Sequence, residues 1–173
     1  MLTVLKDFRI VDEKSDFFGS VIAEDGIITK VYNHEVNDYE NDDLDFLVME
    51  KELEYAILQA DCVLRGGGNK GLVLMPSFVD LHAHFRDPGF PEKETLESAC
   101  LAAARGGFGT VVCMANTRPV IDTIEAARKI KHRAGVLGLI DLYPVLSLTK
   151  EMEGKELSEI TSLSGKDTAD IRL

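Results

Sequence analysis

The chain has 173 residues and carries 19 Lys and Arg side chains against 30 Asp and Glu, a formal net charge of −11 at pH 7. This acidic balance repels phosphate backbones and argues against a nucleic-acid partner. Hydrophobic residues make up 45% of the chain, which is typical of a globular protein with enough apolar material for a core. No apolar run approaches the roughly 20 residues that span a bilayer, and the N-terminal residues lack the zones of a signal peptide. We therefore expect a cytoplasmic protein without a membrane segment.

The three cysteines do not predict a cross-linking role. They are odd in number and widely spaced along the chain, at Cys62, Cys100 and Cys113. This pattern fits neither a disulfide framework nor a zinc knuckle. We expect core or surface thiols.

Residues 1–73 are predicted to form a small β-domain. Aliphatic and β-branched runs separated by polar residues are typical of short strands. A strong turn signal lies between two of these runs, at Asp25-Gly26, because a tight type I′ hairpin needs positive φ at both central residues. The runs occupy residues 2–5, 9–11, 21–23, 27–32, 56–64 and 71–75.

An acidic insertion at about residues 35–54 interrupts this β-domain. Nine acidic side chains occur there against one basic side chain, around an apolar island at 44–49. Charge runs usually form solvated faces, so we interpret the segment as a surface insertion. The alternative interpretation is an acidic docking element whose apolar island contacts a partner.

Residues 74–173 show a different pattern, in which strand-like apolar runs alternate with segments of helical periodicity. This order implies parallel βα units and therefore an α/β fold. The strands are expected at 78–82, at 110–114 and within 136–148, and the helices at 96–105, 122–133 and 155–163.

The first two of these helices have recognisable ends. An apolar face with the i, i+3, i+4, i+7 spacing of a helix is formed by Leu96, Ala99, Cys100 and Ala103. The pair Gly106-Gly107 is expected to end this helix in a left-handed cap. Asp122, followed three residues later by Glu125, resembles a capping box and is expected to begin the second helix.

The segment Pro76–Gly89 carries the chemistry. Side chains two residues apart on a strand point to the same face, so His82 and His84 can present both imidazoles to one point. Imidazole suits zinc, and a strand that leads into a loop is where a βα barrel places its site. Arg86 lies two residues beyond His84 and would therefore face the same side of the strand. Its guanidinium, which can bind a carboxylate, would lie beside the metal. Asp80 is expected to be a buried carboxylate that orients an imidazole. The alternative for the His-x-His tripeptide alone is a pair of structural histidines without a metal.

Three sequence features extend this motif. The step Arg86-Asp87-Pro88-Gly89 resembles the Arg-Glu/Asp-Pro-Gly signature of dihydroorotases, and residues 91–95 resemble their Lys-Glu-Thr entry to the first helix. Residues 114–119 are similar to the Met-x-Asn-Thr-x-Pro segment after their second strand. The stretch thus resembles the cyclic amidohydrolases, which include dihydroorotase, hydantoinase and allantoinase, and within that group it leans towards dihydroorotase. The resemblance covers most of the chain up to about residue 160.

The resemblance implies a fold and an activity. The fold would be the start of a (β/α)8 TIM-type barrel, about three βα units in residues 74–173, preceded by the small β-domain. The activity would be the reversible cyclisation of N-carbamoyl-L-aspartate to dihydroorotate in pyrimidine biosynthesis, with zinc as the cofactor, one or two ions in a complete enzyme.

The resemblance also implies roles for individual residues. His82 and His84 would be metal ligands, while Arg86 and Asn116 would hold the carboxylate of dihydroorotate or N-carbamoyl-L-aspartate. The alternatives are a turn residue for Asn116 and a surface arginine for Arg86. No catalytic residue is identifiable, because the proton-transferring aspartate of the family is expected downstream of the strands in this chain.

A complete barrel has eight βα units, so we expect this chain alone not to be a stable, active enzyme. One alternative function is a non-catalytic dihydroorotase-like subunit that scaffolds another enzyme such as aspartate transcarbamoylase, with the acidic insertion as its docking surface. A second is a sister amidohydrolase acting on hydantoin or allantoin. A homo-oligomer and a complex with aspartate transcarbamoylase are the assemblies that these interpretations suggest.

Overall fold

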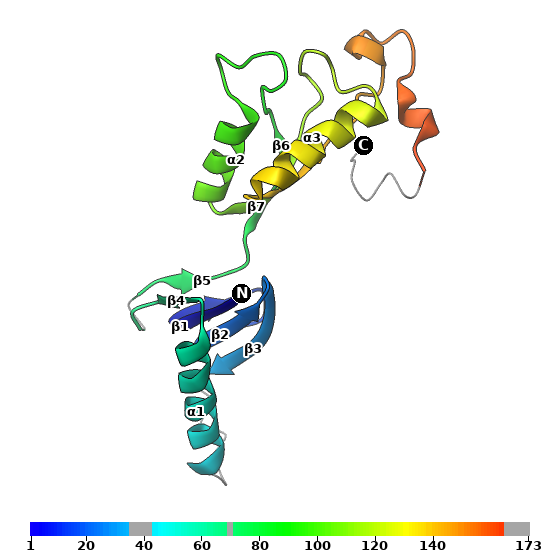
Figure 1. Ribbon diagram of the computed structural model, residues 1–173. Helices are drawn as coiled ribbons and strands as arrows, with labels where there is room; N and C mark the ends of the chain where they lie inside the picture. Colours follow the sequence, from blue (N-terminus) through cyan, green and yellow to red (C-terminus); the bar gives the residue numbers. More distant parts are fainter. Residues whose placement is uncertain (35–42, 69–70, 165–173) are drawn as a thin grey trace. The chain divides into compact units, whose positions relative to one another are not determined.

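A computed structural model describes residues 1–34, 43–68 and 71–164 of the chain (Figure 1). The chain divides into two compact units, Met1–Pro76 and Ser77–Leu173. The change of sequence pattern predicts this division a few residues earlier, between 73 and 74. Both units contain strands and helix, so the fold is mixed α/β, as predicted. Within the described ranges, no helix is both long and apolar enough to cross a membrane.

The first unit is built on a five-stranded sheet. Its strands are β1 (Leu2–Val11), β2 (Asp16–Glu24), β3 (Ile27–Asn33), β4 (Cys62–Arg65) and β5 (Val73–Leu74). The order is β3-β2-β1-β4, and β5 also pairs with β1. The β1–β2 and β2–β3 pairs are antiparallel, whereas β4 and β5 run parallel to β1.

The predicted hairpin is confirmed between β2 and β3. Asp25 has φ 49° and Gly26 has φ 81°, so both central residues of the turn lie in the left-handed region. Glu24 pairs with Ile27 across the turn. This is the two-residue connection that the Asp-Gly dipeptide favours.

Helix α1 (Asp43–Gln59) is the main departure from the sequence analysis. The strand predicted from residue 56 is wrong at its start, because residues 56–59 belong to this helix and β4 begins only at Cys62. Leu53 and Ala56 are buried against Val4 and Ile22 of the sheet, so the helix is held by a tertiary apolar contact. The acidic insertion predicted at 35–54 lies outside the described residues over 35–42, and its end forms part of α1.

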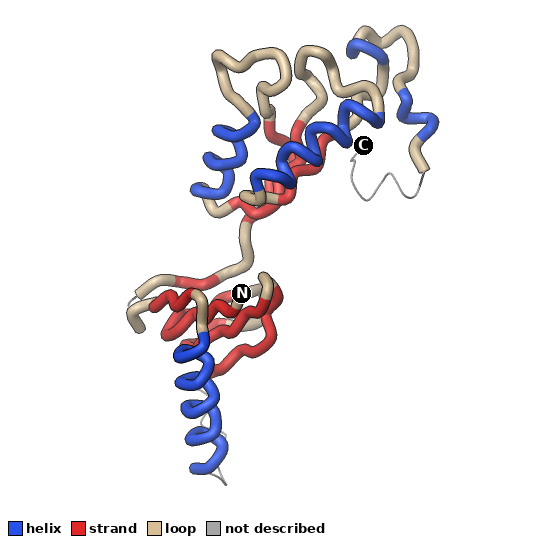
Figure 2. The backbone as a smooth tube through the Cα atoms, in the orientation of Figure 1, coloured by secondary structure: helices blue, strands red, loops and turns tan. Residues whose placement is uncertain are grey.

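The second unit contains a three-stranded parallel sheet in the order β6-β7-β8. Figure 2 shows its strands in red beside the helices in blue. Its elements are β6 (Phe78–Ala83), α2 (Leu96–Arg105), β7 (Phe108–Cys113), α3 (Ile124–Leu137) and β8 (Asp141–Pro144). The predicted alternation of parallel strands and helices is confirmed through β8. The connections that follow β6 and β7 emerge at the same end of the sheet (Figure 1).

Helix α2 has the predicted apolar face and C-terminus. Leu96, Ala99 and Cys100 are buried. Thr95 caps the N-terminus by accepting the Ser98 N–H, and the Ser98 hydroxyl accepts the Thr95 N–H in return. At the other end Gly107 has φ 82°, which is the left-handed conformation expected of a helix stop.

Helix α3 begins one residue later than predicted. Its N-cap is Thr123, whose side chain accepts the Ala126 N–H at 3.2 Å. The predicted cap at Asp122 is wrong, because that carboxylate instead accepts the backbone N–H of Glu151 at 3.0 Å. The helix also continues beyond the predicted end at 133, to the left-handed Gly138.

The helix predicted at 155–163 is wrong. In its place the structure has two short 3₁₀ turns, Lys150–Met152 and Glu159–Ser162. Thr149 and Leu157 form an isolated antiparallel bridge, and the buried Ser158 donates its hydroxyl to the Ser147 carbonyl. These contacts bend the segment back on itself and leave no room for a regular helix. Up to residue 164, the second unit therefore holds two complete βα units and a third strand.

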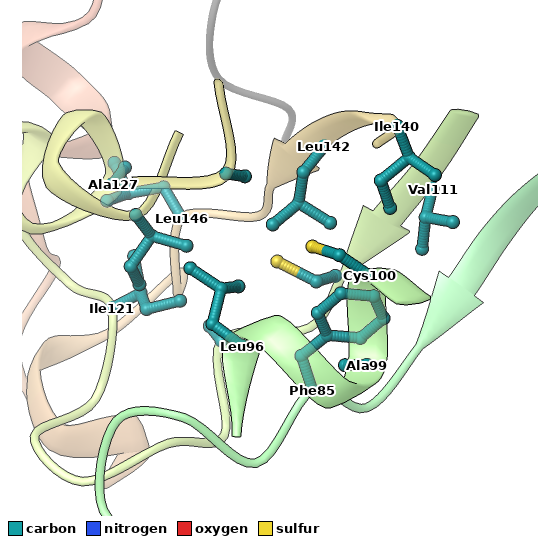
Figure 3. Close-up of a cluster of buried hydrophobic side chains, with 14 residues drawn as sticks. Phe85, Leu96, Ala99, Cys100, Val111, Ile121, Ala127, Ile140, Leu142 and Leu146 are labelled. Atoms are coloured by element: carbon teal, nitrogen blue, oxygen red, sulfur yellow. The ribbon is translucent and has the colours of Figure 1, made fainter. Parts of the chain in front are cut away.

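The core of the second unit lies between the sheet and its two helices (Figure 3). Its labelled side chains are Phe85, Leu96, Ala99, Cys100, Val111, Ile121, Ala127, Ile140, Leu142 and Leu146. Burial raises the pKa of the Cys113 thiol, in the same core, to about 12. Burying the Phe85 ring contributes about 1.5–3 kcal/mol, and it anchors the loop between His84 and Arg86 to the body of the unit.

Candidate active site

The two predicted ligand histidines lie together at the carboxyl end of β6. His82 is in the strand and His84 follows its last residue, and both side chains are exposed. Their ring centres are 5.1 Å apart and their planes are inclined by 70°. The i, i+2 spacing therefore brings both imidazoles to one place, as predicted from strand geometry.

Asn116 reaches the same place from the next connection. It lies three residues beyond β7, and its Oδ1 is 2.8 Å from Nδ1 of His84. An amide oxygen only accepts hydrogen bonds, so the Nδ1–H of His84 donates to it. In the neutral ring Nε2 then carries the lone pair, which is the form that binds a metal.

These three side chains line one pocket of ≈ 670 Å³. Its wall continues along the connections after β7 and β8 and onto the 3₁₀ segment. The other lining residues are Met114, Ala115, Val145, Leu146, Ser147, Leu148, Thr149, Met152 and Ile160. The pocket is therefore at the carboxyl ends of three parallel strands, where α/β folds place their ligand sites. The wall formed by Ser147, Thr149 and Met152 was not predicted, because no pattern in the sequence marked where β8 ends.

Arg86 does not join this group. Its side chain is partly buried, and it is not among the residues that line the pocket. The alternation of side chains along a strand does not predict the direction of Arg86, because β6 ends three residues earlier, at Ala83. Phe85, the residue between His84 and Arg86, is buried.

Asp80 also differs from its predicted role. Its carboxylate is partly exposed, and Oδ1 accepts the backbone N–H of His82 at 2.9 Å. The expectation of a buried carboxylate that orients an imidazole is therefore wrong. Asp80 positions the backbone of the ligand strand rather than a ring.

The loop after His84 is held by Asp87. The Arg133 guanidinium, which donates to both carboxylate oxygens, holds the pKa of Asp87 below its usual value. In the sequence, Asp87 is marked only as part of a motif, and no pattern indicates Arg133 as its partner. No local pattern could have done so, since the partners lie 46 residues apart.

The imidazole pair fits part of a metal centre. Two imidazoles on one tetrahedral zinc have ring centres about 5 Å apart, given Zn–N bonds of 2.0–2.1 Å, and the rings of His82 and His84 meet this condition. Among the described side chains, no cluster of three or more His, Cys, Asp or Glu could hold a metal ion. The chain therefore offers two ligands here, and a complete shell needs others from elsewhere.

The fold and the site together define a class. Paired histidines, an amide and an apolar pocket at the carboxyl ends of parallel strands are typical of α/β enzymes that act on small molecules. A model of the dihydro-orotase-like family matches residues 71–171. The chain belongs to this family.

Individual relatives agree with this assignment. The chain is 32% identical over 172 residues to a dihydroorotase of Clostridium botulinum, an alignment that covers 99% of this chain and 37% of that protein. It is 51% identical over 88 residues to a dihydroorotase of Thermus aquaticus, covering 51% of this chain and 21% of that protein. The chain therefore spans roughly a third or less of the length of these relatives.

A solved structure has a similar fold. The L-hydantoinase (dihydropyrimidinase) of Arthrobacter aurescens matches with a TM-score of 0.60 at 21% identity. The match covers 85% of this chain and 28% of that chain. At this identity the likeness describes the fold alone.

Proposed function

We propose that this chain forms the N-terminal part of a dihydroorotase, an enzyme that interconverts N-carbamoyl-L-aspartate and dihydroorotate in pyrimidine biosynthesis. The observation that carries the proposal is the convergence of His82, His84 and Asn116 on one pocket at the carboxyl ends of parallel strands. In the same proposal β6, β7 and β8 are the first three strands of a (β/α)8 barrel.

His82 and His84 would hold a zinc ion in the complete enzyme. The support is their ring separation of 5.1 Å and the hydrogen bond that leaves Nε2 of His84 available. When bound, zinc lowers the pKa of a coordinated water to about 7 and polarises a carbonyl, which suits the opening of a cyclic amide at neutral pH. The chain's own contribution is to hold the two imidazoles in one orientation.

Arg86 and Asn116 would hold the substrate carboxylate. A guanidinium grips a carboxylate through two parallel N–H bonds, and the Asn116 amide can supply an N–H beside its contact to His84. The pocket of ≈ 670 Å³ is large enough for a ring the size of dihydroorotate. In this proposal the Arg86 side chain turns into the pocket when the substrate binds, and no residue of this chain is assigned the proton transfer.

The requirement for a carboxylate separates this proposal from its nearest alternative. Hydantoin has a cyclic amide but no ring carboxylate, so a hydantoinase does not need an arginine that binds a substrate carboxylate, the role proposed for Arg86. A non-catalytic subunit that binds aspartate transcarbamoylase, or a homo-oligomer of the chain, would need none of the three pocket residues.

The test is a chimera with the Clostridium botulinum dihydroorotase, because the alignment with that protein spans nearly the whole chain. Residues 1–160 of this chain replace the residues that align with them, and hydrolysis of dihydroorotate is measured together with zinc content. We expect an active, zinc-loaded chimera that does not hydrolyse hydantoin. His82→Asn should abolish activity and lower the zinc content, whereas Arg86→Met should raise KM for dihydroorotate at least tenfold.

His132→Asn is the matched control, since His132 lies on α3 and does not line the pocket. It should leave activity and zinc content unchanged. A folded chimera that hydrolyses hydantoin but not dihydroorotate would replace this proposal with the hydantoinase alternative. A folded chimera in which His82→Asn keeps full zinc and activity would reject the assigned ligands.

A further inference from the structure

An ion pair lies beside the loop that carries His84 and Arg86. Nη1 and Nη2 of Arg133 donate to Oδ1 and Oδ2 of Asp87, each at 2.9 Å. The backbone N–H of Leu96 donates to Oδ2 of the same carboxylate at 3.1 Å. The Asp87 side chain is only 17% exposed. One carboxylate therefore ties the loop both to α3 and to the first turn of α2.

A second contact ties the same loop to the connection after β7. The N–H of Arg118 donates to the Pro88 carbonyl at 2.9 Å. Gly89 has φ 108°, and a Cβ added there would lie 2.4 Å from Cβ of Arg118. Because only glycine allows this approach, the two connections pack backbone against backbone. They are the connections that carry His84 and Asn116, whose side chains meet at 2.8 Å.

We propose that Arg133 is a positioning residue for the candidate metal centre. Its bidentate pair with Asp87 fixes the loop three residues beyond His84, and the fixed loop holds the His84 ring against Asn116. A planar guanidinium sets the orientation of a carboxylate as well as its distance, which an ammonium group does not. This inference rests on the proposed function and adds a residue that contacts neither metal nor substrate.

The alternative is that the pair only stabilises the unit. In that case loss of Arg133 would lower the melting temperature and leave the His84 ring unchanged. The decisive readout is therefore the tautomer of His84, which ¹⁵N NMR reports directly. The hydrogen bond to Asn116 requires the proton on Nδ1.

The experiment uses the 173-residue chain and its Arg133→Met and Arg133→Lys variants. In Arg133→Met we expect the Nδ1–H form of His84 to give way to a mixture of tautomers. We also expect the affinity for cobalt(II), read from its visible spectrum, to fall about tenfold, as is typical for a lost supporting contact. Compared with Arg133→Met, Arg133→Lys should recover part of both signals, since a lysine keeps the positive charge but lacks the two parallel N–H donors of the guanidinium.

Arg9→Met is the matched control. Arg9 also donates to both oxygens of a carboxylate, that of Asp16, but in the first unit. Its loss should leave the His84 tautomer and the cobalt affinity as in the unaltered chain. A change of equal size in Arg9→Met would show that the signals follow general stability, and it would overturn the proposal.

If Arg133→Met gives no cooperative melt, Asp87→Asn replaces it, because an amide oxygen can still accept the Leu96 N–H. A folded variant of either kind with an unchanged His84 tautomer and unchanged cobalt affinity overturns the proposal, even if its melting temperature is lower. If the variants change the tautomer but the chimera of the proposed function loads no zinc, the positioning role stands and the metal assignment of the proposed function fails.

Discussion

At the scale of single residues, His34 shows how a partly buried imidazole acquires a preferred charge state. Its Nε2 is 3.3 Å from the hydroxyl of the buried Ser20, and its ring meets Phe18 edge to face at 5.3 Å. Ser20 Oγ accepts the Asp7 N–H, and its hydroxyl either donates to Nε2 or accepts from it, depending on the tautomer of the ring. Burial of the ring lowers the pKa of His34, because it disfavours the charged imidazolium.

This lowered pKa predicts a pH dependence. A histidine whose pKa is lower in the folded chain contributes its full stability above the unfolded value of about 6.5 and loses it as the pH falls through the folded pKa. An NMR titration of the His34 ring should therefore give a midpoint below about 6.5. A midpoint at or above that value would contradict burial as the dominant influence on this ring.

At the same scale, part of the candidate site is readable from the sequence and part is not. His82 lies in β6 and His84 directly follows the last residue of that strand, so the alternation still holds over this one step and brings the two rings together. Arg86 lies beyond the strand, where alternation no longer predicts direction. The Arg133–Asp87 pair joins two units of the βα alternation, and only the packing of α3 brings these side chains together.

At the scale of elements, α1 and the segment 155–163 depart from prediction for opposite reasons. In α1 a helical face does exist, because Leu53, Ala56 and Ile57 follow the i, i+3, i+4 spacing, and all three pack in the first core. The density of acidic residues in this segment instead predicts a solvated surface insertion. In 155–163 the local pattern favours a helix, but the tertiary bonds of Ser158 override that preference.

The N-terminus of α3 offers a direct test of one corrected element. Thr123→Ala should lower the free energy of unfolding by about 1 kcal/mol, because the Ala126 N–H loses its acceptor. Thr123→Ser should retain most of the stabilisation by the N-cap, because a serine hydroxyl can also accept the Ala126 N–H. Asp122→Asn keeps an acceptor for the Glu151 N–H and should cost less than about 0.5 kcal/mol. Urea unfolding of the three variants measures these differences, and a larger loss in Asp122→Asn than in Thr123→Ala would return the cap to Asp122.

At the scale of the whole molecule, the two units have separate cores, and each sheet has an edge strand with exposed apolar side chains, which in the first unit are Ile27, Ile28 and Val31 of β3. In the second unit the sheet ends at β6, as far as the described residues show. Along that strand Phe78, Val79 and Leu81 are 49%, 57% and 72% exposed. Single exposed apolar side chains are ordinary, whereas a run of them on an open edge strand invites pairing with another chain.

This exposed strand predicts the solution behaviour of the 173-residue chain. We expect concentration-dependent self-association in light scattering, together with binding of the dye ANS. Leu81→Lys should reduce both signals, because a charge on an edge strand opposes strand pairing. Val136→Lys is the control, since Val136 is 75% exposed but lies on helix α3. If the chain stays monomeric at all concentrations, or if both variants reduce association equally, the chain does not self-associate through β6.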